Sequence, residues 1–361
     1  MLIITSESKA IVPPLLEALD ALGFIARFID PSEFGGVMAA VGMPDATLRV
    51  ALSDLNKTSL APDSDGSRLK LASEQVLLAF DGLRIALDQG DFRAVFRALR
   101  HVPRAQEALY PLAATMPGVN KFFLDPSVRD DDAVQMRCLT PARSEETGVI
   151  HVHNAFSDRG GYSIYVPETY TPDRSWPLVM ALHGGSGHGR GFLWSWLRAA
   201  RSFGAIVIAP TATGGTWALM GNDIDTPNLA RILASVRERW NIDPRRLLMT
   251  GMSDGGTFCY VSGLDSESPF THLGPVSATF HPMLAEMADG DRLRGLPMYL
   301  VHGVLDWMFP VEVARQAQQA LSKAGANVTY REIGDLAHTY PREINAPMLA
   351  WLTETPVLAR Q

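Results

Sequence analysis

Apolar and polar positions follow two alternating periodicities in the second half of the chain. Short, nearly continuous apolar runs are typical of strands buried on both faces of a sheet. Between them, apolar residues recur every three or four positions, as at Leu229, Ile232, Leu233 and Val236, which indicates amphipathic helices. The strand-like runs are residues 163–167, 177–182, 204–209, 275–280, 298–302 and 328–333. From about residue 145 onward we therefore expect a mostly parallel central sheet flanked by helices.

The first 140 residues show a different pattern. Two short apolar runs, residues 2–5 and 24–29, flank a helical pattern over residues 9–22, which suggests a small βαβ start. Further helical segments follow, one of which ends near Gly90. The chain is thus predicted to hold a small N-terminal α/β accessory domain over 1–140 and a larger domain over 145–361. No residue of the accessory domain indicates chemistry, so we expect it to serve packing or oligomerisation, or to cap a site.

Composition narrows the class of protein. The 361 residues are 47% apolar and 20% charged, as in an ordinary globular protein, and the net charge of −7 argues against nucleic acid as a partner. No apolar run has the length of a membrane span, so no membrane partner is expected. The N-terminus shows no signal peptide, and two cysteines, Cys138 and Cys259, fit a reducing compartment. Cytoplasmic localisation is the resulting expectation.

One short motif carries the first indication of chemistry. Residues 251–256 read Gly-Met-Ser-Asp-Gly-Gly and directly follow the apolar run 247–249. A Gly-x-Ser-x-Gly turn between a strand and a helix lifts a serine hydroxyl away from the sheet edge. The glycines leave room for the strand and the helix to pass closely. We interpret Ser253 as a nucleophile that attacks an acyl carbon.

A serine nucleophile needs a base and a carboxylate that orients the base. In hydrolases built on such a sheet the chain order is serine, acid, histidine. His338 follows the last predicted strand and is the predicted base, whereas the earlier histidines precede or belong to the acid segment. Asp306 follows a buried strand and is the predicted acid. Asp335 and Glu312 are the second and third candidates for the acid.

The remaining site residues lie in glycine-rich and tryptophan-containing loops. The run His-Gly-Gly-Ser-Gly at residues 183–187 follows a buried strand, and we assign the oxyanion-stabilising N–H groups to Gly185 and Asp254. A phosphate cradle is excluded because the register is wrong and no lysine follows. Trp217 and Trp307 are candidate substrate contacts, with core packing as the alternative. A pair of histidines at 151 and 153 lacks a third ligand, so no metal and no cofactor is expected.

Taken together, these motifs resemble those of the α/β-hydrolase superfamily. Within it, they are most similar to the phospholipase/carboxylesterase branch, near the dienelactone-hydrolase-like and polyhydroxybutyrate-depolymerase-like serine esterases. The matching segments are residues 182–185, 242–246, 251–256, 302–306 and 337–338, within about 145–355. The resemblance implies an α/β-hydrolase fold with eight strands and a two-step acyl-enzyme mechanism using Ser253, His338 and Asp306. Two features depart from it: dienelactone hydrolases use cysteine at the nucleophile, and secreted depolymerases carry an export signal.

The function predicted from the sequence is a serine carboxylesterase that hydrolyses small to medium acyl esters. A serine peptidase of the prolyl-oligopeptidase type is the alternative, although those enzymes resemble longer chains with a repeated-blade propeller. Thioesterase and lactonase activities use the same machinery, and a non-catalytic hydrolase-fold binding protein is the least favoured reading. The expected partner is a small-molecule ester, and a homo-oligomer through the N-terminal domain is a further expectation.

Overall fold

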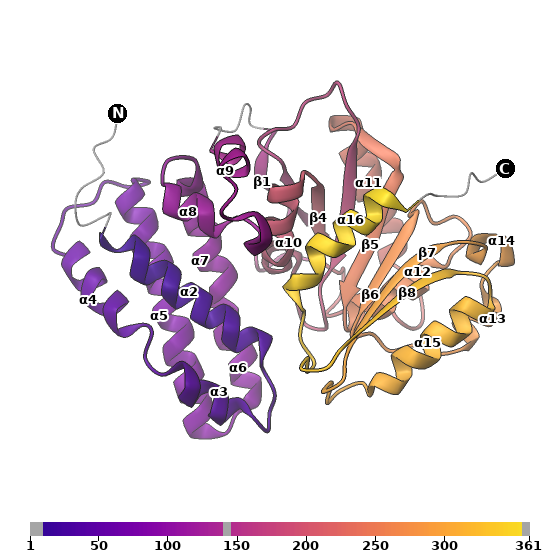
Figure 1. The fold of residues 1–361 in the computed structure, drawn as a ribbon, viewed down its shortest axis with the longest axis horizontal. Coiled ribbons are helices and arrows are strands. Elements are labelled where there is room, and N and C mark those ends of the chain that lie inside the picture. The colour runs from indigo at the N-terminus through magenta and orange to yellow at the C-terminus, as the bar shows by residue number, and fades with distance from the viewer. Residues whose placement is uncertain (1–9, 140–145, 356–361) are drawn as a thin grey trace. The chain divides into compact units, whose positions relative to one another are not determined.

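The structure is a computed structural model that describes residues 10–139 and 146–355. The chain divides into two compact units, Met1–Pro141 and Ala142–Gln361, shown in Figure 1. This division falls between the two domains that the sequence analysis expects over 1–140 and 145–361. The C-terminal unit holds the predicted site.

The described part of the N-terminal unit consists of helices and contains no strand. Its α-helices are α2 (Val12–Arg27), α3 (Phe34–Val41), α4 (Ala46–Leu55), α5 (Asp65–Gln89), α6 (Phe92–Leu99), α7 (His101–Leu109), α8 (Pro117–Phe122) and α9 (Asp132–Cys138). The 25-residue α5 ends at Gly90, whose φ of 64° gives the left-handed cap expected there. The prediction of an α/β fold is therefore wrong for the described part of this unit.

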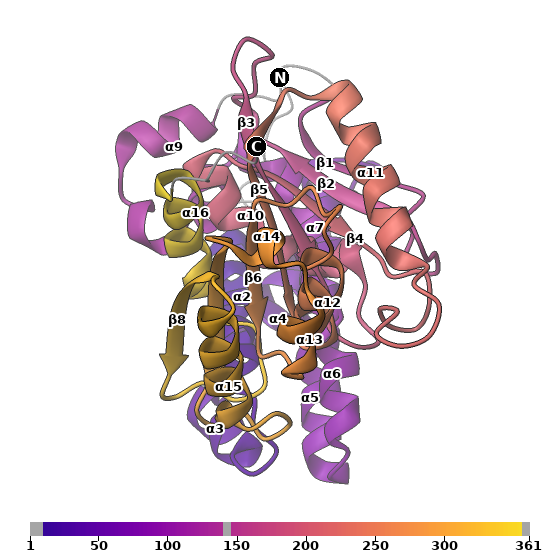
Figure 2. The same cartoon turned by 90° about the vertical axis from the view of Figure 1, so that its right-hand side faces the viewer.

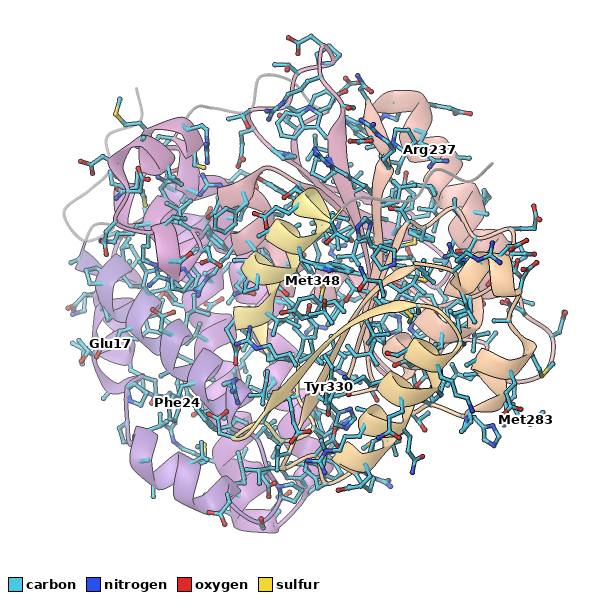
Figure 3. All side chains as sticks on the ribbon, turned by 45° about the vertical axis from the view of Figure 1, so that its right-hand side comes forward. Glu17, Phe24, Arg237, Met283, Tyr330 and Met348 are labelled. Carbon is cyan, nitrogen blue, oxygen red and sulfur yellow. The ribbon has the colours of Figure 1, made fainter. Side chains whose placement is uncertain are left out.

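The error lies at residues 24–29, which were expected to form a strand. Helix α2 continues through Gly23 to Arg27, because Leu15, Leu22 and Ile25 lie on one buried face at helical spacing. Phe24, which falls between these positions, is largely exposed on α2 (Figure 3). A single glycine costs a helix only about 1 kcal/mol, and burial of this face outweighs it. The other predicted strand, residues 2–5, lies outside the described residues.

A buried ion pair joins two helices of this unit. Asp45, at the start of α4, is fully buried and accepts hydrogen bonds from Arg84 of α5 and from Arg49 one turn further along α4. Burial alone would raise the pKa of this carboxyl, but the two guanidinium groups outweigh burial and hold the pKa below its ordinary value. Asp45 is therefore a charged group on whose ionisation the packing of α4 against α5 depends.

Replacing Asp45 with asparagine is expected to lower the free energy of unfolding of this unit by about 1.5–3 kcal/mol at neutral pH, because two charge-assisted hydrogen bonds are lost. The folded pKa is depressed, so this contribution is present above the unfolded pKa and is lost as the pH falls through the folded pKa. Urea titrations at pH 7 and at an acid pH below the folded pKa should therefore show a large difference between wild type and Asp45→Asn only at pH 7. A difference that persists in acid would contradict this account.

The C-terminal unit is built on one eight-stranded sheet with the order β1-β2-β4-β3-β5-β6-β7-β8. Strands β1, β2 and β4 pair antiparallel, and all pairs from β4 to β8 are parallel, which confirms the mostly parallel sheet predicted from the sequence. The strands are β1 (Gly148–Val152), β2 (Tyr162–Val166), β3 (Trp176–Leu182), β4 (Ile206–Pro210), β5 (Ile242–Met252), β6 (His272–Val276), β7 (Pro297–Gly303) and β8 (Asn327–Ile333).

Helices cover both faces of this sheet (Figure 2). Buried residues of α11, α12 and α15 join one core with the strands, whereas α10 and α16 pack on each other, with Asn345 donating to the carbonyl of Ser195 at 2.7 Å. The helices are α10 (Gly189–Phe203), α11 (Asp225–Arg239), α12 (Asp254–Gly263), α13 (Met283–Met287), α14 (Gly290–Leu293), α15 (Val311–Lys323) and α16 (Asn345–Glu354). Both faces of the central strands are thus buried, which explains their continuous apolar sequences.

One predicted strand is displaced along the chain. The expected strand at 275–280 is mostly a loop, since β6 ends at Val276 and Ser277 turns the chain with a φ of 45°. Residues 277–280 are apolar enough to suggest a strand, but Ala278 and Phe280 are buried in the core shared with α12 instead. β6 therefore ends beside the end of β5, where the predicted nucleophile lies.

The sheet reverses its direction of growth between β3 and β5. From β3 the chain crosses to β4 on one side, and it then returns to add β5 on the other side. The loops that leave the carboxyl ends of β3 and β5 therefore diverge, the arrangement at which ligands commonly bind in open α/β sheets. The predicted nucleophile and the predicted oxyanion loop lie in these two loops.

Candidate active site

Ser253 occupies a sharply bent backbone between β5 and α12. Its φ of 55° and ψ of −121° are sparsely populated for a residue with a side chain. The N–H of Ser253 donates to the carbonyl of Val276 in the neighbouring strand at 3.0 Å, which ties the turn to β6. The bend directs the hydroxyl out of the sheet edge at the beginning of α12, as the sequence motif predicts.

The glycines around Ser253 are required by close packing of three elements. A Cβ at Gly255 would lie 2.5 Å from the carbonyl oxygens of Leu182 and His183, at the end of β3. A Cβ at Gly251 would lie 2.5 Å from the backbone of Gly255 itself. Backbone atoms cannot swing aside as a side chain can, so these two positions accept no larger residue without moving the start of α12.

Substituting alanine for Gly255 is expected to lower the stability of the C-terminal unit by about 1–3 kcal/mol, the usual cost of overpacking a dense region. It should also reduce any activity that depends on Ser253, because α12 and the end of β3 must separate. Gly290→Ala is the matched control, since a Cβ there meets nothing within 4 Å. Urea unfolding would contradict the packing argument if the two variants were equally stable.

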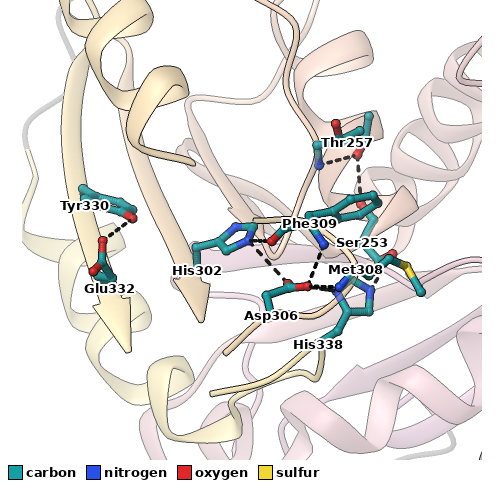
Figure 4. Close-up of polar contacts among 10 residues, drawn as sticks. Ser253, Thr257, His302, Asp306, Met308, Phe309, Tyr330, Glu332 and His338 are labelled. Atoms are coloured by element: carbon teal, nitrogen blue, oxygen red, sulfur yellow. Dashed lines mark hydrogen bonds and ion pairs between the residues drawn. The ribbon is translucent and has the colours of Figure 1, made fainter. Parts of the chain in front are cut away.

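Three side chains predicted to act together are brought together by the fold. His338 Nε2 lies 3.1 Å from Ser253 Oγ, and His338 Nδ1 lies 3.0 and 2.9 Å from the two carboxylate oxygens of Asp306 (Figure 4). The three residues follow β5, β7 and β8, whose carboxyl ends lie along one edge of the sheet. A hydroxyl, an imidazole and a carboxylate in this order can transfer a proton from the hydroxyl to the imidazole while the carboxylate stabilises the imidazolium.

The Asp306 carboxylate is held by its own turn. Oδ1 accepts hydrogen bonds from the backbone N–H groups of Met308 at 2.9 Å and Phe309 at 2.8 Å. Burial alone would raise the pKa of this carboxyl, but the hydrogen bonds from His338, Phe309 and Met308 outweigh it and the pKa lies below its ordinary value. The carboxyl is therefore ionised at neutral pH. Of the other two candidates for the acid, Asp335 and Glu312, the latter pairs with Arg315 at 3.1 Å.

His302 belongs to the same cluster, and the sequence analysis treated it only as part of the acid segment. Its Nε2 lies 2.8 Å from the carbonyl of Phe309 and 3.4 Å from Asp306 Oδ2 (Figure 4). The imidazole thus closes the turn that carries Asp306. The spacing His-Gly-x-x-Asp in the sequence is the signal that could have indicated the contact between His302 and Asp306.

The loop that follows β3 lies against the turn of Ser253. A Cβ at Gly184 would contact Ser253 Cβ at 3.5 Å, and a Cβ at Gly185 would meet Asp254 Oδ2 at 2.7 Å. Among residues 146–355, the backbone N–H groups of Gly185 and Asp254 donate to no protein acceptor. Two free N–H groups beside a serine hydroxyl are suited to bind a carbonyl oxygen that becomes negative.

His183 contacts this loop as a neutral imidazole. Burial lowers the pKa of His183 to about 4. One ring nitrogen, Nδ1, lies 2.7 Å from the carbonyl of Gly184, and the other, Nε2, accepts the N–H of Ala212 at 3.1 Å. These partners fix the tautomer with the proton on Nδ1 and anchor the loop to the segment after β4.

The two tryptophans expected near substrate have different surroundings. Trp217 is 2% exposed, donates its indole N–H to the carbonyl of His183 at 2.7 Å and stacks on Phe258. The structure therefore places it in the core, where it braces the glycine loop, and this corrects the expectation of a substrate contact. Trp307 is 41% exposed, and its ring centroid lies 5.8 Å from that of His338.

The strand order and the residues at the strand ends decide the fold. A nucleophile turn after β5, an acid after β7 and a histidine after β8 occur on a sheet that reverses its growth between β3 and β5. This unit has the α/β-hydrolase fold. The fold expected from the sequence resemblance is thereby confirmed for residues 146–355.

Comparison with known proteins gives distant similarities. No protein-family model matches the chain. A curated relative, the bifunctional acetylxylan esterase/xylanase of Neocallimastix patriciarum, is 28% identical over 150 residues, which are 40% of this chain and 21% of that protein. The chain thus spans about a fifth of the length of this relative.

Similar solved structures include a ferulic acid esterase, with a TM-score of 0.48, 18% identity and coverage of 57% of this chain and 96% of the other. The S-formylglutathione hydrolase of Staphylococcus aureus has a TM-score of 0.47 and 16% identity, and covers 58% of this chain and 99% of its own. A truncated carbohydrate esterase from gut microbiota has a TM-score of 0.47 and 15% identity over 58% and 98% of the two chains. Similarities this distant do not transfer a substrate from one protein to another.

Two observations on the part of the chain that the structure describes bear on metal and membrane binding. Within it, no group of three or more His, Cys, Asp or Glu side chains is placed to hold a metal ion. His151 instead pairs its Nδ1 with the hydroxyl of Ser163 at 2.7 Å. No helix among the described residues has the length and apolar character needed to cross a membrane.

Proposed function

We propose that the chain is a serine carboxylesterase whose catalytic residues are Ser253, His338 and Asp306. The observation that carries the proposal is the continuous hydrogen-bonded path from the Ser253 hydroxyl through both nitrogens of His338 to Asp306. The strained backbone of Ser253 supports it, because strain of this kind concentrates at functional sites. The ionised Asp306 supplies the charge that a protonated His338 requires.

The proposed reaction has two steps. Ser253 Oγ attacks the ester carbon while His338 Nε2 accepts the hydroxyl proton, and the carbonyl oxygen becomes an oxyanion. The N–H groups of Gly185 and Asp254 bind this oxyanion, and His338 then returns its proton to the departing alcohol. Water enters, loses a proton to His338 and attacks the acyl-serine. The acid is released and the Ser253 hydroxyl is restored.

Esters of small acyl groups are the proposed substrates. The similarity to an acetylxylan esterase/xylanase favours an acetyl ester as the first candidate. The exposed face of Trp307 beside His338 is the proposed contact for the group bound near the base. Thioesters and lactones would meet the same nucleophile and the same N–H donors, so they remain within the proposed class.

Parallel assays of ester and amide substrates test this proposal. We expect turnover of 4-nitrophenyl acetate and butyrate, and of acetylated xylan by release of acetate, above the uncatalysed rate. Aminoacyl-4-nitroanilides should react far more slowly, because the described part of the N-terminal unit is helical and lacks the strands of the propeller of prolyl-oligopeptidase-type enzymes. Faster turnover of the anilides would favour the peptidase alternative.

The N-terminal unit has no proposed chemistry. We propose that it serves association with a second copy or control of access to substrate. Size-exclusion chromatography with light scattering on the intact chain distinguishes these roles. A monomer at all concentrations would remove oligomerisation from the proposal.

A further inference from the structure

The residue after the nucleophile carries a carboxylate in an unusual place. Asp254 begins α12, and its Oδ2 lies where a Cβ at Gly185 would approach within 2.7 Å. The hydroxyl of Thr216, 38 residues earlier in the chain, donates to the same oxygen. The half-buried carboxylate of Asp254 therefore lies between the turn of Ser253 and the loop that contains Gly185.

Within the described part of the C-terminal unit, the Asp254 carboxylate has no positive partner. Among residues 146–355, no lysine, arginine or histidine lies within ion-pair distance of Asp254, and Oδ1 has no hydrogen-bond partner. In the same unit, the buried carboxylate of Glu168 pairs with Arg201 at 3.1 Å. Arg159 donates instead to the carbonyl of Gly187 at 2.9 Å, on the other side of the glycine loop.

The position has an electrostatic consequence for the proposed reaction. Attack by Ser253 places a new negative charge on the carbonyl oxygen, and the Asp254 carboxylate raises the energy of that charge. The start of α12 and the Thr216 hydroxyl offset part of this effect. A positive group on the substrate would offset the rest, whereas a negative group would add to the repulsion.

We infer that Asp254 selects the substrate by charge, favouring esters whose acyl part carries a cationic group and disfavouring esters whose acyl part is anionic. The inference rests on the proposed function, because it concerns the same site. A role in stabilising the first turn of α12 is the structural alternative, but that role would affect all esters equally. The contact with Thr216, rather than with the N–H groups of α12, sets the carboxylate toward the loop.

Three 4-nitrophenyl esters with the same three-methylene spacer separate charge from size. They are the 4-(trimethylammonio)butyrate, its neutral carbon analogue the 5,5-dimethylhexanoate, and the monoester of glutarate. The quantity compared is the ratio of kcat/KM for the cationic ester to that for the anionic ester, after subtraction of uncatalysed hydrolysis. Wild type, Asp254→Asn and the control Glu238→Gln are assayed, the control being an equal charge change on an exposed residue of α11.

In wild type the ratio should exceed one, and Asp254→Asn should lower it by roughly tenfold, as expected for a unit charge at short range in a partly solvated site. Glu238→Gln should leave it unchanged. Raising NaCl from about 20 mM to about 0.5 M should reduce the wild-type ratio, a result that requires no folded variant.

Two results would overturn the inference while leaving the proposed function intact. One is a ratio that neither salt nor Asp254→Asn changes. The other is an equal fall in kcat/KM for all three esters in Asp254→Asn, with no effect of salt on the wild-type ratio. If wild type hydrolyses 4-nitrophenyl acetate or butyrate but none of the three esters, the inference alone is overturned, whereas failure on all five esters would overturn the proposed function and the inference with it.

Discussion

Alanine in place of Ser253 is expected to lower kcat for 4-nitrophenyl butyrate by about 10⁴- to 10⁶-fold, the range found when a serine nucleophile is removed from a triad. The hydroxyl lies 3.1 Å from His338 Nε2 and is the proposed site of the acyl bond. Without it, the N–H donors of Gly185 and Asp254 still bind the carbonyl, so a small residual rate above water is expected. Covalent labelling by a fluorophosphonate should disappear in the same variant.

The matched control is Ser266→Ala, an exposed serine after α12 that takes no part in the proposed site. It should retain wild-type kcat and wild-type labelling. Ser253→Ala should leave the free energy of unfolding nearly unchanged, because alanine keeps the Cβ and therefore the same strained backbone conformation. Equal rates for wild type and Ser253→Ala would remove the esterase proposal.

Asparagine in place of Asp306 is expected to lower kcat by about 10⁴-fold, with little change in KM. Oδ1 of Asp306 accepts the N–H groups of Met308 and Phe309, so the amide oxygen of asparagine must take that position. The amide NH₂ then faces His338 Nδ1, which can only accept from it. The proton of His338 moves to Nε2, and the ring can no longer take a proton from Ser253.

This variant is compared with Asp335→Asn, which changes the second candidate for the acid. Asp335→Asn should keep most of the activity, whereas Asp306→Asn should lose it without losing near-UV circular dichroism. Since the pKa of Asp306 lies below its ordinary value, wild type should keep this carboxylate charged to a lower pH than an ordinary aspartate. An Asp306→Asn enzyme with more than about a tenth of wild-type kcat would contradict the assigned role.

The proposed triad could be assembled from the sequence because each member lies in the segment that follows a predicted strand of the sheet. Ser253, Asp306 and His338 are fixed by local signals, namely the glycines, an apolar run and the chain order. Parallel pairing then places all strand ends on one edge, so local signals sufficed to predict a long-range site. The same reasoning predicted that the loop containing Gly185 lies at this edge of the sheet, but it did not predict the distances within that loop.

Features set by tertiary packing were not available from the sequence. Burial decided that residues 24–27 continue α2, although their composition suits a strand. Trp217 has the same local sequence features as a pocket residue, and its place in the core follows from Phe258 and the carbonyl of His183, which come from other elements. The spacing of His302 from Asp306 was visible in the sequence, but the contact of His302 with the Phe309 carbonyl was not, because a side-chain pattern does not report a backbone acceptor.

The position of β8 at the border of the sheet has a consequence for how the protein would lose function on heating or in mild denaturant. β8 pairs with β7 alone, and about half of its residues face solvent, so it is the parallel strand most prone to local opening. His338 lies in the segment that follows β8, whereas Ser253 follows β5 in the middle of the sheet. Local opening of β8 would move His338 away from Ser253 while the turn of Ser253 stays folded. Activity should therefore be lost at a lower temperature or denaturant concentration than the helical circular dichroism signal.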